Sequence, residues 1–271
     1  MLAYFDQLLT AWHAGRSGRA AHLGYWPDGA ATISADDDFR EAQRRLDDLV
    51  VAESRLRNGM AILDVACGFG GLIERLNEQF DDVQLTGINI DAHQLDVCQR
   101  LRPRGANRMA WIEGDACDLP IPDQSIDRVF CIEAMFHFAS RRTFLAEVRR
   151  VLRPGGCCVM TDLRLVPATT QSVMPRFAIA ALLNEGYGPW PDPWCRNGDA
   201  ASNCRQLGLS DVIVRDLTAE TRPTWNLISP RSWNWDDDPG DAVSRSGLML
   251  RWLHEHGQLV CELVSAIRGN E

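Results

Sequence analysis

Lysine is absent from this sequence of 271 residues, and all 28 of its basic residues are arginine. The absence excludes a nucleotide P-loop, because that loop uses a lysine to reach the phosphates. Acidic residues outnumber basic ones, which gives a formal net charge of −9 and a pI near 5.2. Such a chain offers no broad positive field to neutralise phosphates, so the composition argues against a nucleic-acid substrate.

Long apolar runs and paired cysteine motifs are missing as well. No segment has the roughly 18 consecutive apolar residues of a membrane span, and the N-terminus lacks a basic flank followed by an apolar run. The nine cysteines are odd in number and show no Cys-x-x-Cys spacing. We therefore expect reduced thiols, no metal site, and a cytoplasmic protein that binds neither nucleic acid nor membrane.

From Met60 onward the chain alternates short apolar runs with helical patterns. The apolar runs predict strands near residues 61–65, 84–89, 109–112, 126–132, 156–162, 211–217 and 259–267. Helical periodicity indicates helices near residues 2–14, 70–80, 91–101, 141–152, 174–185, 200–207 and 248–255, and residues 36–38 could cap a further helix over 39–50. This alternation predicts an α/β fold that is Rossmann-like and doubly wound, with a mostly parallel seven-stranded sheet and right-handed crossovers.

The most informative motif is Asp64-Val-Ala-Cys-Gly-Phe-Gly70, which begins at the end of the first of these apolar runs. A strand, a loop of small residues and a helix form the unit that binds a nucleoside at the carboxyl edge of a parallel sheet. The dinucleotide fingerprint needs a third glycine, and counting from Gly68 that position is Ile73, which disfavours NAD. The remaining ligand is a nucleoside without phosphates, approached by the backbone at Ala66, Gly68 and Gly70.

This motif resembles the first motif of the class I S-adenosylmethionine (SAM) methyltransferases, with Ala66 in the first glycine position. Asn89 lies about 20 residues beyond the glycines, where a ribose-binding carboxylate is usual. The stretch from Gly87 to Gln94 resembles a subgroup that includes sugar O-methyltransferases and sterol and tocopherol C-methyltransferases. The resemblance implies that SAM is the cofactor, bound by Asp64, Ala66, Gly68, Gly70, Asn89 and Gln94. Two alternatives stay open, a loop-stabilising role for Asp64 and a capping box formed by Asp91 and Gln94.

Two further motifs and one acidic residue add to this resemblance. Glu113-Gly-Asp115-Ala116 resembles the family's adenine clamp, although Asp115 could instead be a turn residue. His22-Leu-Gly-Tyr25-Trp26 resembles an N-terminal signature whose aromatic residues close over the cofactor; the alternative is an aromatic anchor for the N-terminal helices. Glu133 directly follows the fourth strand and completes the predicted cofactor contacts.

His137 and Asp162 lie at the ends of the fourth and fifth predicted strands. Related O-methyltransferases have a His and an Asp at these strand ends near the acceptor hydroxyl, and a histidine can remove a proton at neutral pH. The resemblance implies a SAM-dependent methyltransferase of the EC 2.1.1 class, acting on a small, hydrophobic natural-product acceptor, with O-methylation favoured. The alternatives are C- or N-methylation, a SAM-binding cyclase-type enzyme that transfers no methyl group, a non-catalytic SAM-binding subunit, and a structural role for His137.

The motifs divide the chain into four parts. We expect an N-terminal helical cap with an aromatic loop (1–58), a SAM-binding core (59–164), a tryptophan-rich lid or acceptor-binding insertion (165–240), and a C-terminal helix with a closing strand (241–271). The insertion also contributes the strand near 211–217. The sequence leaves a homodimer open.

Overall fold

The structure is a computed structural model that describes residues 3–27, 36–167, 175–194, 199–228 and 240–269. Its strands are β1 (Ala61–Val65), β2 (Gln84–Asn89), β3 (Arg108–Glu113), β4 (Ile126–Ile132), β5 (Leu152–Leu165), β6 (Leu209–Asp216) and β7 (Leu259–Arg268). Its helices are α1 (Ala3–His13), α2 (Asp36–Ser54), α3 (Gly71–Gln79), α4 (Ala92–Cys98), α5 (Arg141–Val151), α6 (Arg176–Tyr187), α7 (Ala200–Gln206), α8 (Thr218–Ile228) and α9 (Ala242–Glu255), with a short 3-10 turn, η1 (Met135–His137).

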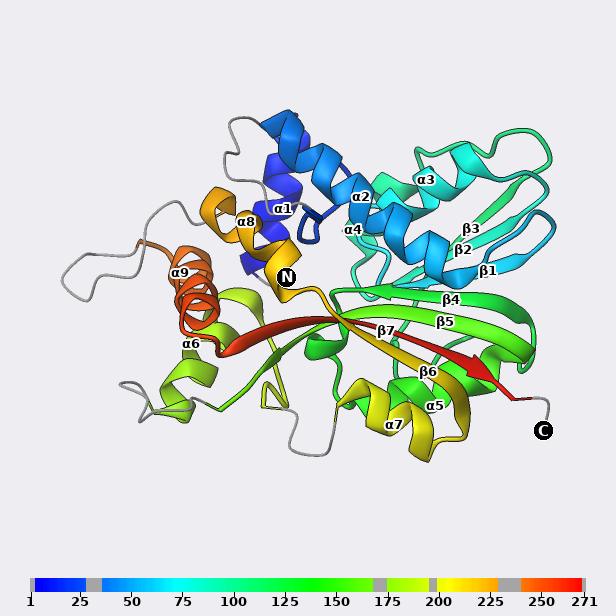
Figure 1. The fold of residues 1–271 in the computed structure, drawn as a ribbon. Helices are drawn as coiled ribbons and strands as arrows, with labels where there is room; N and C mark the ends of the chain where they lie inside the picture. Colours follow the sequence, from blue (N-terminus) through cyan, green and yellow to red (C-terminus); the bar gives the residue numbers. More distant parts are fainter. Residues whose placement is uncertain (1–2, 28–35, 168–174, 195–198, 229–239, 270–271) are drawn as a thin grey trace.

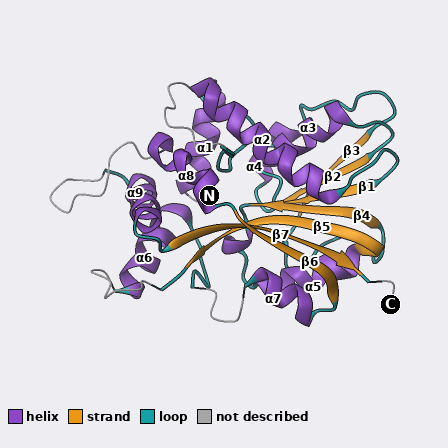
Figure 2. Cartoon of the chain, in the orientation of Figure 1, coloured by secondary structure: helices purple, strands orange, loops and turns teal. Residues whose placement is uncertain are grey.

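One seven-stranded sheet runs through the molecule in the order β3-β2-β1-β4-β5-β7-β6. Strands β1 to β5 pair in parallel with one another, whereas β7 is antiparallel to both β5 and β6. Helices α2, α3 and α4 lie over one face of the sheet, and α5 and α7 lie over the other (Figures 1 and 2). The predicted fold class is confirmed.

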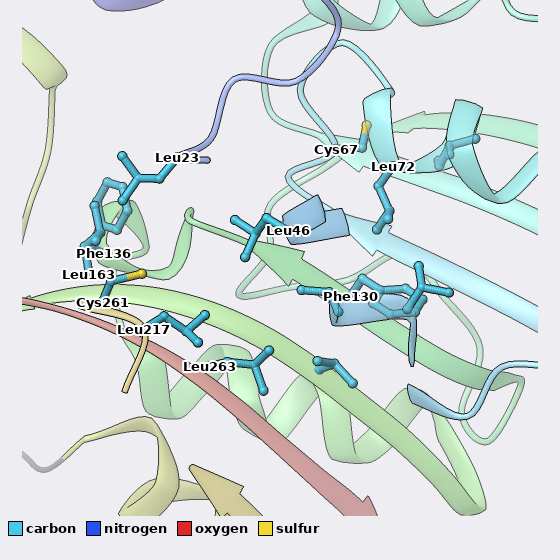
Figure 3. Close-up of a cluster of buried hydrophobic side chains, with 14 of the residues drawn as sticks. Leu23, Leu46, Cys67, Leu72, Phe130, Phe136, Leu163, Leu217, Cys261 and Leu263 are labelled. Atoms are coloured by element: carbon cyan, nitrogen blue, oxygen red, sulfur yellow. The ribbon is translucent and has the colours of Figure 1, made fainter. Parts of the chain in front are cut away.

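The central strands read as continuous apolar runs because helices cover both faces of the sheet. All five residues of β1 are buried. Figure 3 shows part of the core on the α2 side, where Leu46 of α2 and Phe130 of β4, both fully buried, belong to one cluster. Leu23, from the segment after α1, belongs to the same cluster, so the N-terminal part of the chain is anchored in the core.

Helices α1, α6, α8 and α9 gather beyond the carboxyl ends of the parallel strands (Figure 1). Helices α6 and α9 approach closely at Gly186, where an added Cβ would lie 2.1 Å from the Ser246 Oγ atom. Asp241 caps α9 by accepting from the Ser244 backbone N–H, and the helix begins earlier than the sequence predicts. Helix α9 packs mainly on α6, which belongs to the segment 165–240 predicted as a lid.

Helix α8 was missed by the sequence prediction, which placed no helix between residues 207 and 248. The helix contains Pro223, a residue that usually ends a helix, and it buries Trp225 against the core. Trp233 and Trp235, the other tryptophans of that stretch, lie outside the described residues. Within the described part of the chain, no helix combines the length and the apolar character that crossing a membrane requires.

Candidate cofactor site and active site

The loop between β1 and α3 has an unusual backbone. Ala66, Gly68 and Gly70 adopt positive φ angles of 59°, 54° and 79°, and the Gly70 N–H donates to the Cys67 carbonyl across 2.9 Å. A Cβ added to Gly68 would find only the Gln94 Oε1 atom within 4 Å, at 3.9 Å, so the space above this glycine is open. The backbone at Gly68 is therefore open to a ligand, and contact of the loop with the cofactor stays a prediction. Alanine at position 66 brings backbone strain as well as an extra methyl group, since L-residues rarely adopt positive φ.

Two amide side chains meet at the carboxyl end of β2. The Asn89 Nδ2 atom donates to Gln94 Oε1 across 2.9 Å, and Asn89 Oδ1 accepts from the Ile90 backbone N–H. Asp91 caps α4 through the N–H groups of His93 and Gln94, but the Gln94 side chain turns to Asn89, so only half of a capping box forms. The Gln94 Nε2 atom is buried without a hydrogen-bond partner in the structure. A buried unpaired donor is costly, and an oxygen of a bound nucleoside would satisfy it.

The end of β3 carries the predicted adenine-binding pair. Ala116 is buried, whereas Asp115 is exposed and its Oδ1 atom accepts from the Cys117 N–H across 2.8 Å. This bond gives Asp115 the turn role that the sequence left open. Its Oδ2 atom stays available to accept from an amine of a ligand. Sequence reasoning missed Trp111 of β3, whose ring would lie 2.5 Å from a Cβ on Gly87 and 3.0 Å from one on Gly70. Both glycines are thus needed for this tryptophan to pack beneath the loop.

Acidic side chains lie at the ends of β1 and β4. Asp64 is buried, and burial, reinforced by the Asp47 charge and opposed by His22, raises its pKa to about 8. Glu133 follows β4 with a φ of 49°, and its Oε2 atom accepts from the Leu23 N–H across 2.9 Å. Burial raises the pKa of Glu133 to about 7, and its buried Oε1 atom has no hydrogen-bond partner in the structure. The structure therefore brings both predicted acids to the sheet edge where the glycine loop lies.

His22 and Asp47 form a buried pair that the sequence analysis did not assign. The His22 Nε2 atom lies 3.2 Å from Asp47 Oδ1, and its Nδ1 atom lies 2.8 Å from the Leu23 carbonyl. Burial alone would lower the pKa of His22, but the Asp47 carboxylate outweighs it and raises the pKa to about 9. His22 is thus an imidazolium at neutral pH, with its Nδ1–H donating to the Leu23 carbonyl and its Nε2 atom in an ion pair with Asp47. The sequence signal for His22 was its position in the aromatic motif 22–26. No sequence signal marked Asp47, because it lies within an ordinary amphipathic helix.

Tyr25 and Trp26 contact helices and an edge strand. The Tyr25 hydroxyl accepts from Arg215 of β6 across 3.4 Å. The Trp26 ring stacks on Phe39 of α2 with centroids 6.3 Å apart, and its backbone N–H donates to the Glu220 carbonyl of α8. These contacts match the anchoring role that the sequence left open for both residues. Direct contact with the cofactor stays a prediction.

His137 ends the η1 turn that follows β4. Its Nδ1 atom lies 2.9 Å from the Pro189 carbonyl. Because a carbonyl only accepts, Nδ1 must carry the proton, which leaves the lone pair on Nε2. Burial lowers the pKa of His137, so the ring is neutral at pH 7. A ring in this state can accept a proton at Nε2.

Asp162 lies near the end of β5 in a buried ion pair with Arg141. The Arg141 Nε and Nη2 atoms donate to the two Asp162 oxygens across 2.7 and 3.3 Å. Burial raises the pKa of Asp162, and the guanidinium opposes that rise. Arg141 also donates to the Asp192 carbonyl across 3.0 Å, so one side chain joins the predicted catalytic Asp to the loop 188–194.

The loop 188–194 is held against the sheet edge at several points. The Leu165 N–H donates to the Pro193 carbonyl, and the buried Trp190 ring lies 4.5 Å from that of Phe136. A shallow cavity of about 370 Å³ is lined by Asn184, Gly188, Pro189, Trp190 and Pro191. Pro189 is also the hydrogen-bond partner of His137, so the apolar hollow lies next to the neutral His137 ring.

Known proteins resemble the chain in both sequence and fold. Residues 63–160 match a family model described as a methyltransferase domain. The chain is 30% identical over 247 residues to O-methyltransferase cnsE of Penicillium expansum, a match that covers 89% of this chain and 83% of the relative. It is 29% identical over 239 residues to 27-O-demethylrifamycin SV methyltransferase of Amycolatopsis mediterranei, covering 84% and 79%. Among solved structures, the 4+2 cyclase SpnF superposes with a TM-score of 0.71 at 22% identity, covering 98% of this chain and 94% of that one.

The site fits the cofactor that this family uses. An open space above Gly68, left-handed backbone at three loop positions and an unpaired buried donor at Gln94 suit an adenosyl group approached by backbone. The SpnF likeness shows the fold alone, whereas the cnsE match extends over most of both chains at higher identity. The chain belongs to the class I S-adenosylmethionine-dependent methyltransferases.

Proposed function

We propose that the protein transfers a methyl group from SAM to a hydroxyl group of a small, hydrophobic natural product. The observation that carries this proposal is the state of His137, a neutral ring with Nδ1 tied to Pro189 and a lone pair on Nε2. A hydroxyl must lose a proton when it is methylated, and a group with this protonation can accept it. The names of the two relatives described above point to oxygen as the methylated atom and to natural-product acceptors.

Bound SAM would supply a methyl group activated by the positive charge of its sulfonium. Asn89 and Gln94 would hold the ribose, Asp115 and Ala116 the adenine, and the remaining predicted contacts the rest of the molecule: Asp64, Ala66, Gly68, Gly70 and Glu133. Tyr25 and Trp26 would support the cofactor site by anchoring the N-terminal segment. Most of the acceleration would come from holding the two reactants in line and excluding water.

His137 and Asp162 would then have different roles. We propose that His137 takes the proton from the acceptor hydroxyl, a contribution of roughly 10²- to 10⁴-fold in rate. Asp162 is engaged at both oxygens by Arg141, so we assign it to holding Arg141 and the loop 188–194 in place. An electron-rich carbon or an amine acceptor would make less demand on His137.

The test is a product analysis. The purified protein is incubated with SAM and a panel of hydroxylated aromatic and polyketide compounds, and methylated products are located by mass spectrometry and NMR. A new O-methyl signal that disappears with His137→Ala supports the proposal. A C-methyl or N-methyl product would overturn O-methylation, and a rearranged acceptor without methylation would favour a cyclase-type reaction.

A further inference from the structure

The segment after α1 lies directly on the cofactor loop. A Cβ added to Gly71, the first residue of α3, would lie 3.1 Å from both the Ala20 nitrogen and the Arg19 carbonyl carbon. These are backbone atoms that cannot move aside by rotating a side chain. The N-terminal segment therefore forms a wall against the end of the glycine loop, and glycine at position 71 permits this approach.

Arg19, in this segment, joins four parts of the molecule. Its Nη1 atom donates to the Phe69 carbonyl across 2.8 Å and to the Val97 carbonyl at the end of α4 across 3.4 Å. Its Nε atom lies 3.2 Å from the Glu74 carboxylate of α3, and the side chain is only 12% exposed. The guanidinium also lies 4.9 Å above the Trp12 ring of α1, which in turn stacks on Phe69 with centroids 5.9 Å apart. A planar guanidinium can make these contacts together because its donors point in fixed directions and its face stacks on an aromatic ring.

The bond to Phe69 acts on the peptide unit between Phe69 and Gly70. That unit ends at Gly70, and Gly68 precedes Phe69; both glycines are in the left-handed region, and rotation about the Gly70 φ meets little steric resistance. The unit is held at both of its polar groups. Its N–H is held by the Cys67 carbonyl and its C=O by Arg19, from opposite sides. Without the arginine, the carbonyl would have to find water or another donor, and the loop would gain conformations that bind the cofactor less well.

We infer that Arg19 is a positioning residue for the cofactor, acting through the Phe69 carbonyl to hold the glycine loop in its binding shape. The inference rests on SAM being the ligand of this loop, as the proposed function requires. Arg19 lies outside the matched methyltransferase domain, in the cap, so it makes cofactor affinity depend on the N-terminal segment and on Trp12. This is a property that the glycine motif alone does not provide.

The test compares Arg19→Gln and Arg19→Lys with Arg75→Gln. Arg75 of α3 is a matched control, because its guanidinium makes two bonds to Asp48 of α2, 2.9 and 3.0 Å long, away from the loop. Affinity for S-adenosylhomocysteine is measured by calorimetry, and amide hydrogen exchange of the unliganded protein is followed in the peptide spanning 67–72. We expect Arg19→Gln to weaken binding about tenfold and to speed exchange there, since a hydrogen bond from a charged group is lost. Arg19→Lys should recover part of the affinity, and Arg75→Gln should leave both readouts unchanged.

The outcomes separate this inference from the proposed function. Wild-type protein that does not bind S-adenosylhomocysteine would refute the cofactor assignment, whatever the variants do. Wild-type affinity in Arg19→Gln, or an equal loss in Arg75→Gln, would overturn the positioning role of Arg19. If Arg19→Gln does not fold, Gly71→Ala decides instead, because its methyl group displaces the segment without changing any charge. Weakened binding by that variant supports the inference, and unchanged binding overturns it.

Discussion

The cofactor side and the acceptor side of this active site are built in different ways. On the cofactor side, the binding surface is backbone in a short loop, closed by bonds such as that from Gly70 to Cys67, three residues away. On the acceptor side, His137 is oriented by the Pro189 carbonyl, 52 residues further along the chain. Arg141 donates to the Asp192 carbonyl, 51 residues further along. The first surface is closed mainly by local bonds, with Arg19 of the cap as its one proposed distant support, and the second is specified by tertiary packing. This difference explains why relatives can share a cofactor while their acceptors differ.

The largest expected effect is on the local, backbone-built side. Gly68→Val should abolish cofactor binding, a loss of more than about 100-fold, because a β-branched residue is strained at a φ of 54° and its side chain fills the open space. Gly105→Val is the control, since Gly105 has a φ of 55° but lies in the turn before β3. Calorimetry with S-adenosylhomocysteine and a melting curve are recorded for both. Equal affinities in the two variants would show that Gly68 matters only for folding.

The next effect concerns the acceptor side. His137→Ala should lower turnover by roughly 10²-fold or more, because the proton acceptor is removed, while leaving cofactor affinity within about twofold of wild type. The wild-type rate should fall at acidic pH with a midpoint below the ordinary histidine value, since burial lowers the pKa of His137. Steady-state rates across pH with an acceptor found in the product screen provide the measurement. A loss confined to cofactor binding would instead assign His137 a structural role.

The same contrast decides how much of the molecule could be predicted from its sequence. The sheet, its strands and the glycine loop follow from short apolar runs and small residues that are contiguous in the chain, and the structure contains them. Helix α8 could not be predicted, because Pro223 argues against a helix and only tertiary burial of Trp225 outweighs it. The partners of Asp162 and His137, namely Arg141 and Pro189, were invisible for a similar reason, since no local pattern records which distant segment folds back against a strand end.

A third prediction concerns the effect of the buried Asp64 carboxylate on the stability of the folded protein. Burial raises the pKa of Asp64 from 3.8 to about 8, so the folded state binds a proton more tightly than the unfolded state. The stability that wild type has below pH 4 is therefore lost as pH rises through about 8. Asp64→Asn should escape this loss and melt higher than wild type by about 5 °C at pH 8.5, with little difference at pH 4. The same variant should bind S-adenosylhomocysteine more weakly, because Asp64 is a predicted contact.

Calorimetric melting at both pH values, with and without ligand, tests this prediction. Asp123→Asn is a suitable control, because Asp123 is an exposed carboxylate paired with Arg150 at the protein surface. A variant that is less stable than wild type at pH 8.5 would mean that Asp64 stabilises the loop through its charge. The cofactor side would then be as dependent on side chains as the acceptor side.

The smallest expected effect again concerns the backbone of the cofactor loop. Ala66 has a φ of 59°, and glycine should relieve strain there at the expense of a more flexible unfolded chain. We expect Ala66→Gly to raise the melting temperature by about 2 °C, a net gain of about 0.5 kcal/mol, with unchanged or slightly tighter cofactor binding. Ala110→Gly, in β3, where the alanine is exposed and φ is not positive, should lower it by a comparable amount. If both variants lose stability equally, the left-handed residue carries no strain, and the loop has adapted to alanine through its neighbours.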